Sequence, residues 1–290
     1  MSADMPIAQY VLTPGAQFRS RAQELDLSKI RTAARTHFRF NIQVASELYY
    51  RGKQNNYHLE NDFGSLRSPY DNCWFEWRWP STMVIDGKES PSPQITRVAA
   101  VVETGDDTKS DNLFLLSQIL MQAPGQPVTV MPVSDLIQTT PDGNYIKGSR
   151  RWPYPKSVMT EAEADQMGSY LGSEMNVLYL ALNLINCRNV TTAKAGTIPV
   201  RRSGRAKKKR IPQLDYHTIV LPGMPSPGRR GAAVDDAAMP LHRVRGHFKT
   251  FTAEAPLLGQ HVGTYWWGWQ VRGNKKNGVV VSDYKIGAAS

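Results

Sequence analysis

Short stretches of the chain alternate apolar with polar residues, or run apolar for a few residues between turn signals, and these stretches predict β-strands. The predicted strands are residues 72–79, 95–103, 112–121, 127–133, 214–221, 241–251, 262–271 and 278–286. Polar residues, glycines and prolines separate them, and we expect these strands to form an antiparallel sheet.

Two longer stretches repeat apolar residues at a helical period. Residues 17–52 predict one long helix. A second helix is expected from Thr160 to about Ile185, because Thr160 and Glu163 have the spacing of a capping box. Its second half is apolar on more than one face, which predicts a position in the centre of the core. The expected fold is therefore α+β, an antiparallel sheet packed against two long helices, with a basic C-terminal β-rich module.

The composition changes along the chain in a way that predicts three regions. Residues 1–187 are expected to form the α+β core region. Residues 188–238 are a basic and Pro/Gly-rich linker with one strand, and residues 239–290 are a C-terminal β module.

Composition also bounds the class of protein. Hydrophobic residues make up 41% of the 290 residues, enough for a globular core. No run approaches the roughly 18–20 apolar residues of a membrane span, and the first residues lack a signal-peptide pattern. Cys73 and Cys187 are too few for a disulfide framework. We therefore expect a protein of the cytoplasm with no membrane contact.

The positive charge is concentrated at one end of the chain. Residues 188–290 carry 18 Lys and Arg but 5 Asp and Glu, a net charge of +13. Residues 1–187 carry 17 Lys and Arg and 20 Asp and Glu, a net charge of −3. This asymmetry predicts a localised anionic partner, and a solvated basic surface is the alternative.

One of the C-terminal strands carries a stripe of basic side chains. Arg243, Arg245, His247 and Lys249 alternate and would share one face. Arginine and lysine suit phosphate oxygens, and imidazole titrates near neutral pH, so His247 is the candidate catalytic residue if the protein is an enzyme. Gly246 predicts a bulge or a close approach of the backbone, which fits a ligand lying against the strand. A charged edge strand without a ligand is the alternative.

The next strand is dense in aromatic residues. Tyr265, Trp267 and Trp269 would share one face, whereas Trp266 would point to the other. An exposed aromatic face offers stacking positions for nucleobases, and burial of these rings in the core is the alternative. Three basic residues come shortly after this strand and would contact phosphates: Arg272, Lys275 and Lys276.

A third basic segment lies upstream, at residues 201–210, and contains almost no apolar residue. Such a segment is typical of a nucleic-acid-binding arm that orders on a phosphate backbone, or of a solvated linker. Its candidate contacts are Arg201, Arg202, Lys207, Lys208, Lys209 and Arg210.

Several kinds of site are not indicated by the sequence. It contains neither a phosphate-binding glycine loop nor a nucleophile elbow. His242 and His247 have no carboxylate or thiolate near them in sequence to complete a metal site. We therefore predict no metal and no cofactor.

Residues 242–251, His-Arg-Val-Arg-Gly-His-Phe-Lys-Thr-Phe, with the aromatic strand and Val-Arg-Gly behind them, resemble the C-terminal module of a group of uncharacterised phage and plasmid proteins. That H-x-x-R-G-H-[FW] module is distantly similar to the tail of type V-A anti-CRISPR proteins, from which Val244 and Phe248 depart. The matching positions are His242, Arg245, Gly246 and His247. The resemblance implies a mobile-element origin, recognition of a nascent effector polypeptide and loss of its mRNA.

The first functional hypothesis is a phage or mobile-element accessory protein that binds RNA or a ribonucleoprotein through its basic C-terminal third. It would counteract host defence in the anti-CRISPR-like case, and a host protein is an alternative partner. The second is a metal-independent ribonuclease in which His247 is the acid or base, with Arg243, Arg245 and Lys249 on the scissile phosphate. The third is a virion or assembly protein whose basic end contacts packaged DNA. Whether the protein is an enzyme, and its oligomeric state, stay open at this point.

Overall fold

The computed structural model describes most of the N-terminal two thirds of the chain and parts of the remainder. The described residues are 5–19, 27–54, 64–79, 82–85, 88–91, 96–108, 110–195, 214–222, 240–244, 246–268, 270–272 and 274–279. The backbone alone is described for residues 51–54, 82–85, 88–91, 195, 240–244, 270–272 and 274–279.

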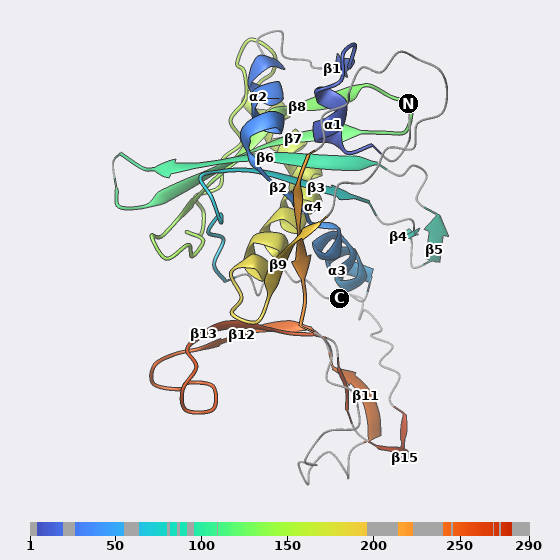
Figure 1. Cartoon of the computed structure of the whole chain (residues 1–290), viewed down its shortest axis with the longest axis vertical. Coiled ribbons are helices and arrows are strands. Elements are labelled where there is room, and N and C mark those ends of the chain that lie inside the picture. The colour runs from blue at the N-terminus through green and yellow to red at the C-terminus, as the bar shows by residue number, and fades with distance from the viewer. Residues whose placement is uncertain are drawn as a thin grey trace, which may run out of the picture.

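The largest element is a mixed sheet of eight strands in the order β1-β8-β7-β6-β3-β2-β10-β9 (Figure 1). The neighbours β8, β7, β6 and β3 are antiparallel, as are β10 and β9. The pairs β1–β8, β2–β3 and β2–β10 are parallel, so the expected antiparallel sheet is in fact mixed. The strand bounds are β1 Phe18–Arg19, β2 Phe38–Asn41, β3 Asn72–Arg78, β6 Arg97–Asp106, β7 Leu113–Gln122, β8 Val128–Thr139, β9 Thr191–Ala195 and β10 Tyr216–Val220.

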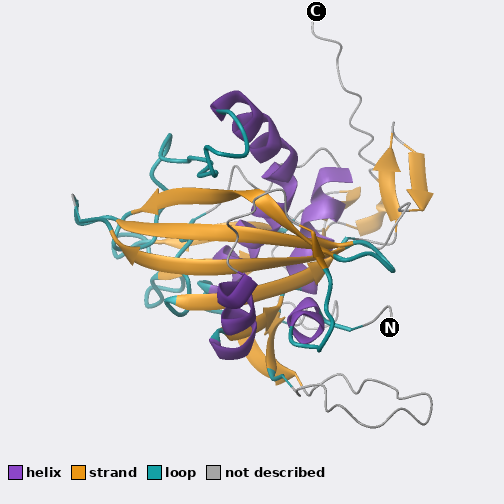
Figure 2. Ribbon diagram, turned by 90° about the horizontal axis from the view of Figure 1, so that it is seen from above, coloured by secondary structure: helices purple, strands orange, loops and turns teal. Residues whose placement is uncertain are grey.

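Helices cover both faces of this sheet. α1 (Ile7–Val11) and α2 (Leu27–Thr36) pack on one face, and α3 (Gln43–Gln54) and α4 (Glu161–Ile185) pack on the other. In Figure 1 α1 and α2 lie in the upper part at the level of β7 and β8, whereas α3 and most of α4 lie below β6; Figure 2 shows the long strands side by side. Each helix pair therefore forms its own hydrophobic core with the sheet between them.

The apolar run of β6 follows from this burial on both faces. Val98, Ala100 and Val102 join the core with α4, whereas Ala99 and Val101 join the core with α1 and α2. A strand buried on both faces has apolar residues at successive positions instead of a simple alternation.

The prediction of a single long helix at residues 17–52 is wrong. The chain forms β1, α2, β2 and α3 there, and α4 is the one long helix among the described residues. The error centres on Phe38 and Phe40, whose spacing of two places both rings on one face of β2. β2 lies between β3 and β10, so partners distant in sequence override the local helical pattern.

The second long helix is confirmed. Thr160 caps α4, and the reciprocal bonds of the capping box with Glu163 are both present. Every residue from Glu174 to Leu184 except Asn176 is buried, so this half of α4 runs through the core as expected. No helix in the described part of the chain is long and apolar enough to cross a membrane.

The C-terminal region forms short ladders, and the predicted strand 241–251 is divided between two of them. β11 (Pro240–Val244) pairs with β14 (Gln270–Arg272) and β15 (Asn274–Val279). β12 (His247–Phe251) pairs with β13 (Gly263–Trp267), and upstream β4 (Thr82–Ile85) pairs with β5 (Lys88–Pro91). The basic stripe predicted along one strand is therefore divided between β11, which ends at Val244, and β12, which begins at His247.

Candidate functional site

The β12–β13 hairpin presents two different faces. Residues directly opposite each other in an antiparallel pair point to the same side. Phe248 opposite Trp266 defines the inner face, and His247 opposite Trp267 starts the outer face. The outer face of the hairpin is defined here as the side that carries His247, Lys249, Phe251, Tyr265 and Trp267.

The inner face packs into the core of α3 and α4. Trp266 is 3% exposed and belongs to that core, and the ring of Phe248 lies 4.8 Å from its ring. A Cβ atom on Gly246 would lie 2.7 Å from a ring carbon of Trp266. The glycine therefore allows the close approach of the Trp266 ring, whereas the sequence alone favoured a ligand lying against this strand.

The end of α4 holds the hairpin in place. The side chain of Asn189 accepts a hydrogen bond from Trp266 N at 2.9 Å and donates one to Trp266 O at 2.8 Å. The backbone N–H of Arg188 donates to Thr264 O at 2.9 Å. These bonds pair the turn after α4 with the edge of β13 much as another strand would, and together with the buried Trp266 they fix the hairpin against the core.

Aromatic rings and a lysine gather on the outer face of the hairpin. The rings of His247 and Trp267 are stacked, with centroids 6.5 Å apart and an interplanar angle of 16°. Lys249 Nζ lies 4.9 Å from the ring centroid of Phe251 and 5.9 Å from that of Trp267. Phe251 meets the edge of Tyr265 with centroids 5.8 Å apart. Lys249 is exposed and the rings are half-buried, so each ring keeps part of its surface for a ligand.

Arg188 adds a second cation at the end of this hairpin. Its Cγ and Nε atoms lie 3.1 Å from the position of a Cβ on Gly263, which pairs with Phe251. Gly263 has a φ of +123°, a conformation that side chains disfavour. The site therefore combines Lys249, Arg188 and a cluster of aromatic rings.

Of the residues predicted for the site, the structure brings together His247, Lys249, Tyr265 and Trp267. Phe251 was missed although its position two residues after Lys249 continues the alternation. Arg188 was missed because the docking of α4 on the hairpin places it, and no local pattern shows that contact.

The remaining candidates lie elsewhere or outside the described residues. Arg243 and Arg272 have their backbones in β11 and β14, and Lys275 and Lys276 in β15. The predicted positions outside the described residues are Arg245, Trp269, Arg201, Arg202, Lys207, Lys208, Lys209 and Arg210. Their roles stay predictions.

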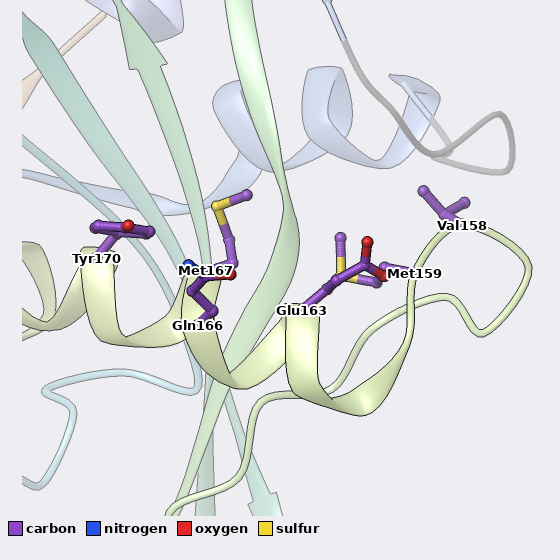
Figure 3. A pocket seen from close by; sticks show the side chains of 6 residues that line it. All are labelled: Val158, Met159, Glu163, Gln166, Met167 and Tyr170. Atoms are coloured by element: carbon purple, nitrogen blue, oxygen red, sulfur yellow. The ribbon is translucent and has the colours of Figure 1, made fainter.

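An open pocket of about 240 Å³ lies at the start of α4 (Figure 3). Its lining is Val158, Met159, Glu163, Gln166, Met167 and Tyr170. The carboxylate of Glu163 already serves the capping box of α4. The pocket is therefore lined mainly by apolar groups and offers no evident reaction chemistry.

A buried ionic cluster beside α4 stabilises the fold. Asp135 accepts hydrogen bonds from Arg150 Nε at 2.9 Å and Nη2 at 3.2 Å, and also from the hydroxyl of Tyr179. The Arg150 guanidinium lies 4.4 Å from the ring centroid of Trp152. Burial raises the pKa of Asp135, and Arg150 and Tyr179 oppose that rise. These contacts tie the loop after β8 to the sheet and to α4.

Comparison with known proteins gives no relative: no family model, no curated protein and no solved structure matches the chain. Within the residues that the structure describes, no group of three His, Cys, Asp or Glu residues is placed to hold a metal ion.

Proposed function

We propose that the protein binds single-stranded RNA through the outer face of the hairpin. The observation that carries this proposal is Lys249, whose ammonium lies over Phe251 and Trp267 on a face whose opposite side is anchored in the core. The lysine suits a phosphate and the rings suit bases, which are the two repeating parts of a nucleic-acid strand.

A single strand fits this face better than a duplex. Stacking on aromatic side chains needs the flat face of a base, and in a duplex those faces are covered by neighbouring base pairs. Each base stacked on a protein ring contributes about 1–3 kcal/mol. The anchored inner face keeps the rings in place before binding, which reduces the entropy lost on association.

The wider role we propose is that of a phage or mobile-element accessory protein that acts on RNA or a ribonucleoprotein in the host cytoplasm. The concentration of positive charge after residue 187 supports an anionic target. The resemblance to phage and plasmid modules supports the origin. A host protein as the direct partner is the competing assignment, and a binding assay with purified RNA separates the two.

The full-length protein is expected to bind a fluorescently labelled twelve-nucleotide oligouridylate, with an affinity that falls steeply as salt rises because phosphate contacts release counterions. Lys249→Ala should weaken binding and reduce the slope of log affinity against log salt by about 1. Lys156→Ala is the matched control, since Lys156 is exposed near the other end of α4. Fluorescence anisotropy over a salt series measures both effects. Affinity that is insensitive to salt, or equal losses for the two variants, would contradict the proposal.

A ribonuclease is the second candidate, because the imidazole of His247 lies against Trp267 and beside Lys249 on the same face. If the protein only binds RNA, the labelled RNA stays intact in EDTA and His247→Gln lowers affinity by no more than a few fold. If His247 is an acid or base, wild type cleaves the RNA and His247→Gln slows cleavage by about 10²–10⁴-fold at nearly unchanged affinity. Denaturing gels of the same binding reactions measure this, and we expect intact RNA.

A further inference from the structure

A second pair of stacked rings lies on the surface, away from the hairpin. Phe38 of β2 and Tyr70, just before β3, have ring centroids 3.7 Å apart and an interplanar angle of 10°. Phe38 is 47% exposed and Tyr70 is 44% exposed. Rings this large are usually buried, and two of them stacked flat at the surface leave ring area open to a further planar group.

The pair is held rigidly from behind. Phe40 lies 6.4 Å from Tyr70 and 5.2 Å from Phe75, so a series of rings connects the surface pair to the core. Ser68 Oγ donates to Tyr70 O at 2.7 Å, which fixes the turn that carries Tyr70. A fixed ring pair loses little conformational entropy when a ligand stacks on it.

The segment that carries Tyr70 is joined to the hairpin through the end of α4. The Asn186 side chain donates to Ser65 O at 3.3 Å and to Arg67 O at 2.8 Å. Two residues later, Arg188 N donates to Thr264 O in β13. Figure 1 shows the segment before β3 running between the level of the hairpin and the sheet. The end of α4 and the turn after it therefore connect the segment of Tyr70 to the hairpin.

We infer that Phe38 and Tyr70 form a second stacking site for a base of the same RNA strand that binds the hairpin, an inference that rests on the proposed function. Arg67 and Arg188 are exposed cations of the two segments that these hydrogen bonds connect, and they suit the phosphates between the two stacking sites. The exposed carboxylate of Asp71 follows Tyr70 directly, so the ring pair itself favours a base over a phosphate. The bound strand would thus be longer than the hairpin alone accommodates.

The test compares a four-nucleotide and a twelve-nucleotide oligouridylate with the full-length protein. Phe38→Ala should weaken binding of the twelve-nucleotide RNA by about 5- to 100-fold, the loss of one stacked base, and change binding of the four-nucleotide RNA by less than about twofold. Phe38→Trp keeps a stacking ring and should restore wild-type affinity. Tyr170→Ala, which removes another exposed ring from α4, is the matched control and should have no effect.

A direct signal comes from 2-aminopurine placed at the 5′ end or at the 3′ end of the longer RNA. Quenching at one end on binding, lost in Phe38→Ala, supports the second site even if the affinity change is small. If Phe38→Ala behaves like Tyr170→Ala in both measurements while Lys249→Ala weakens binding, the second site is wrong and the proposed function stands. If the wild-type protein binds neither RNA, both are wrong.

Discussion

Glu76→Leu is expected to lower the free energy of unfolding by about 3–5 kcal/mol, because it leaves buried hydrogen-bond donors without an acceptor. Glu76 of β3 accepts four hydrogen bonds at the interface of the sheet with α1. The donors are Ile7 N at 3.0 Å, Ala8 N at 2.8 Å, Trp74 Nε1 at 2.6 Å and Tyr216 OH at 2.9 Å. The carboxylate thus holds α1, β3 and β10 together.

Urea unfolding followed by circular dichroism measures this loss. Glu103→Leu is the matched control, since Glu103 is an exposed glutamate of the neighbouring strand β6, and its replacement should change stability by about 0.5 kcal/mol or less. Equal stabilities of the two variants would show that the four bonds to Glu76 do not hold the layers together.

The pH dependence gives the same site a second check. Burial raises the pKa of Glu76 above its ordinary 4.5, although the four hydrogen bonds oppose the rise. The folded protein therefore binds this proton more tightly than the unfolded chain does. The stabilisation from the proton is complete below pH 4.5 and is lost as the pH rises through the raised pKa. Glu76→Gln does not titrate at this position, so the stability of wild type relative to it should fall as the pH rises above about 4.5.

Local signals in the sequence were sufficient for some elements and not for others. Thr160 and Glu163 form the cap of α4 from residues three apart, so the sequence alone predicted where the helix begins. The strand β2 could not be found this way, because its partners His217 and Phe75 come from distant parts of the chain. A short apolar segment takes the structure that its neighbours in the sheet impose on it.

The same distinction applies to the candidate site. Alternation along the chain separated Trp266 from Trp267, and the structure confirms that they lie on opposite faces of β13. Alternation did not show that the basic segment is divided between β11, which ends at Val244, and β12, which begins at His247. Nor did it show Arg188 beside Gly263. Contacts across elements are set by packing, and a single sequence carries no local trace of them.

The two adjacent tryptophans of β13 are expected to give opposite results when each is replaced by alanine. Trp266 is 3% exposed in the core, so Trp266→Ala should lower the free energy of unfolding by about 3–5 kcal/mol through the lost burial and the cavity left behind. Trp267 is half-buried on the outer face, so Trp267→Ala should cost about 1 kcal/mol of stability or less.

Replacing Trp267, which costs little stability, should in contrast lower the affinity for RNA. Trp267→Ala removes one stacking ring and one of the two aromatic partners of Lys249, and should weaken binding of the twelve-nucleotide RNA by about 5- to 100-fold. Trp267→Phe keeps a ring and should retain most of the affinity, which separates stacking from a general disturbance of the hairpin. Urea unfolding and fluorescence anisotropy on the same preparations measure the two effects. A Trp267→Ala protein that loses stability and keeps its affinity would mean that the outer face of the hairpin is structural, because its rings would then contribute to folding and not to binding.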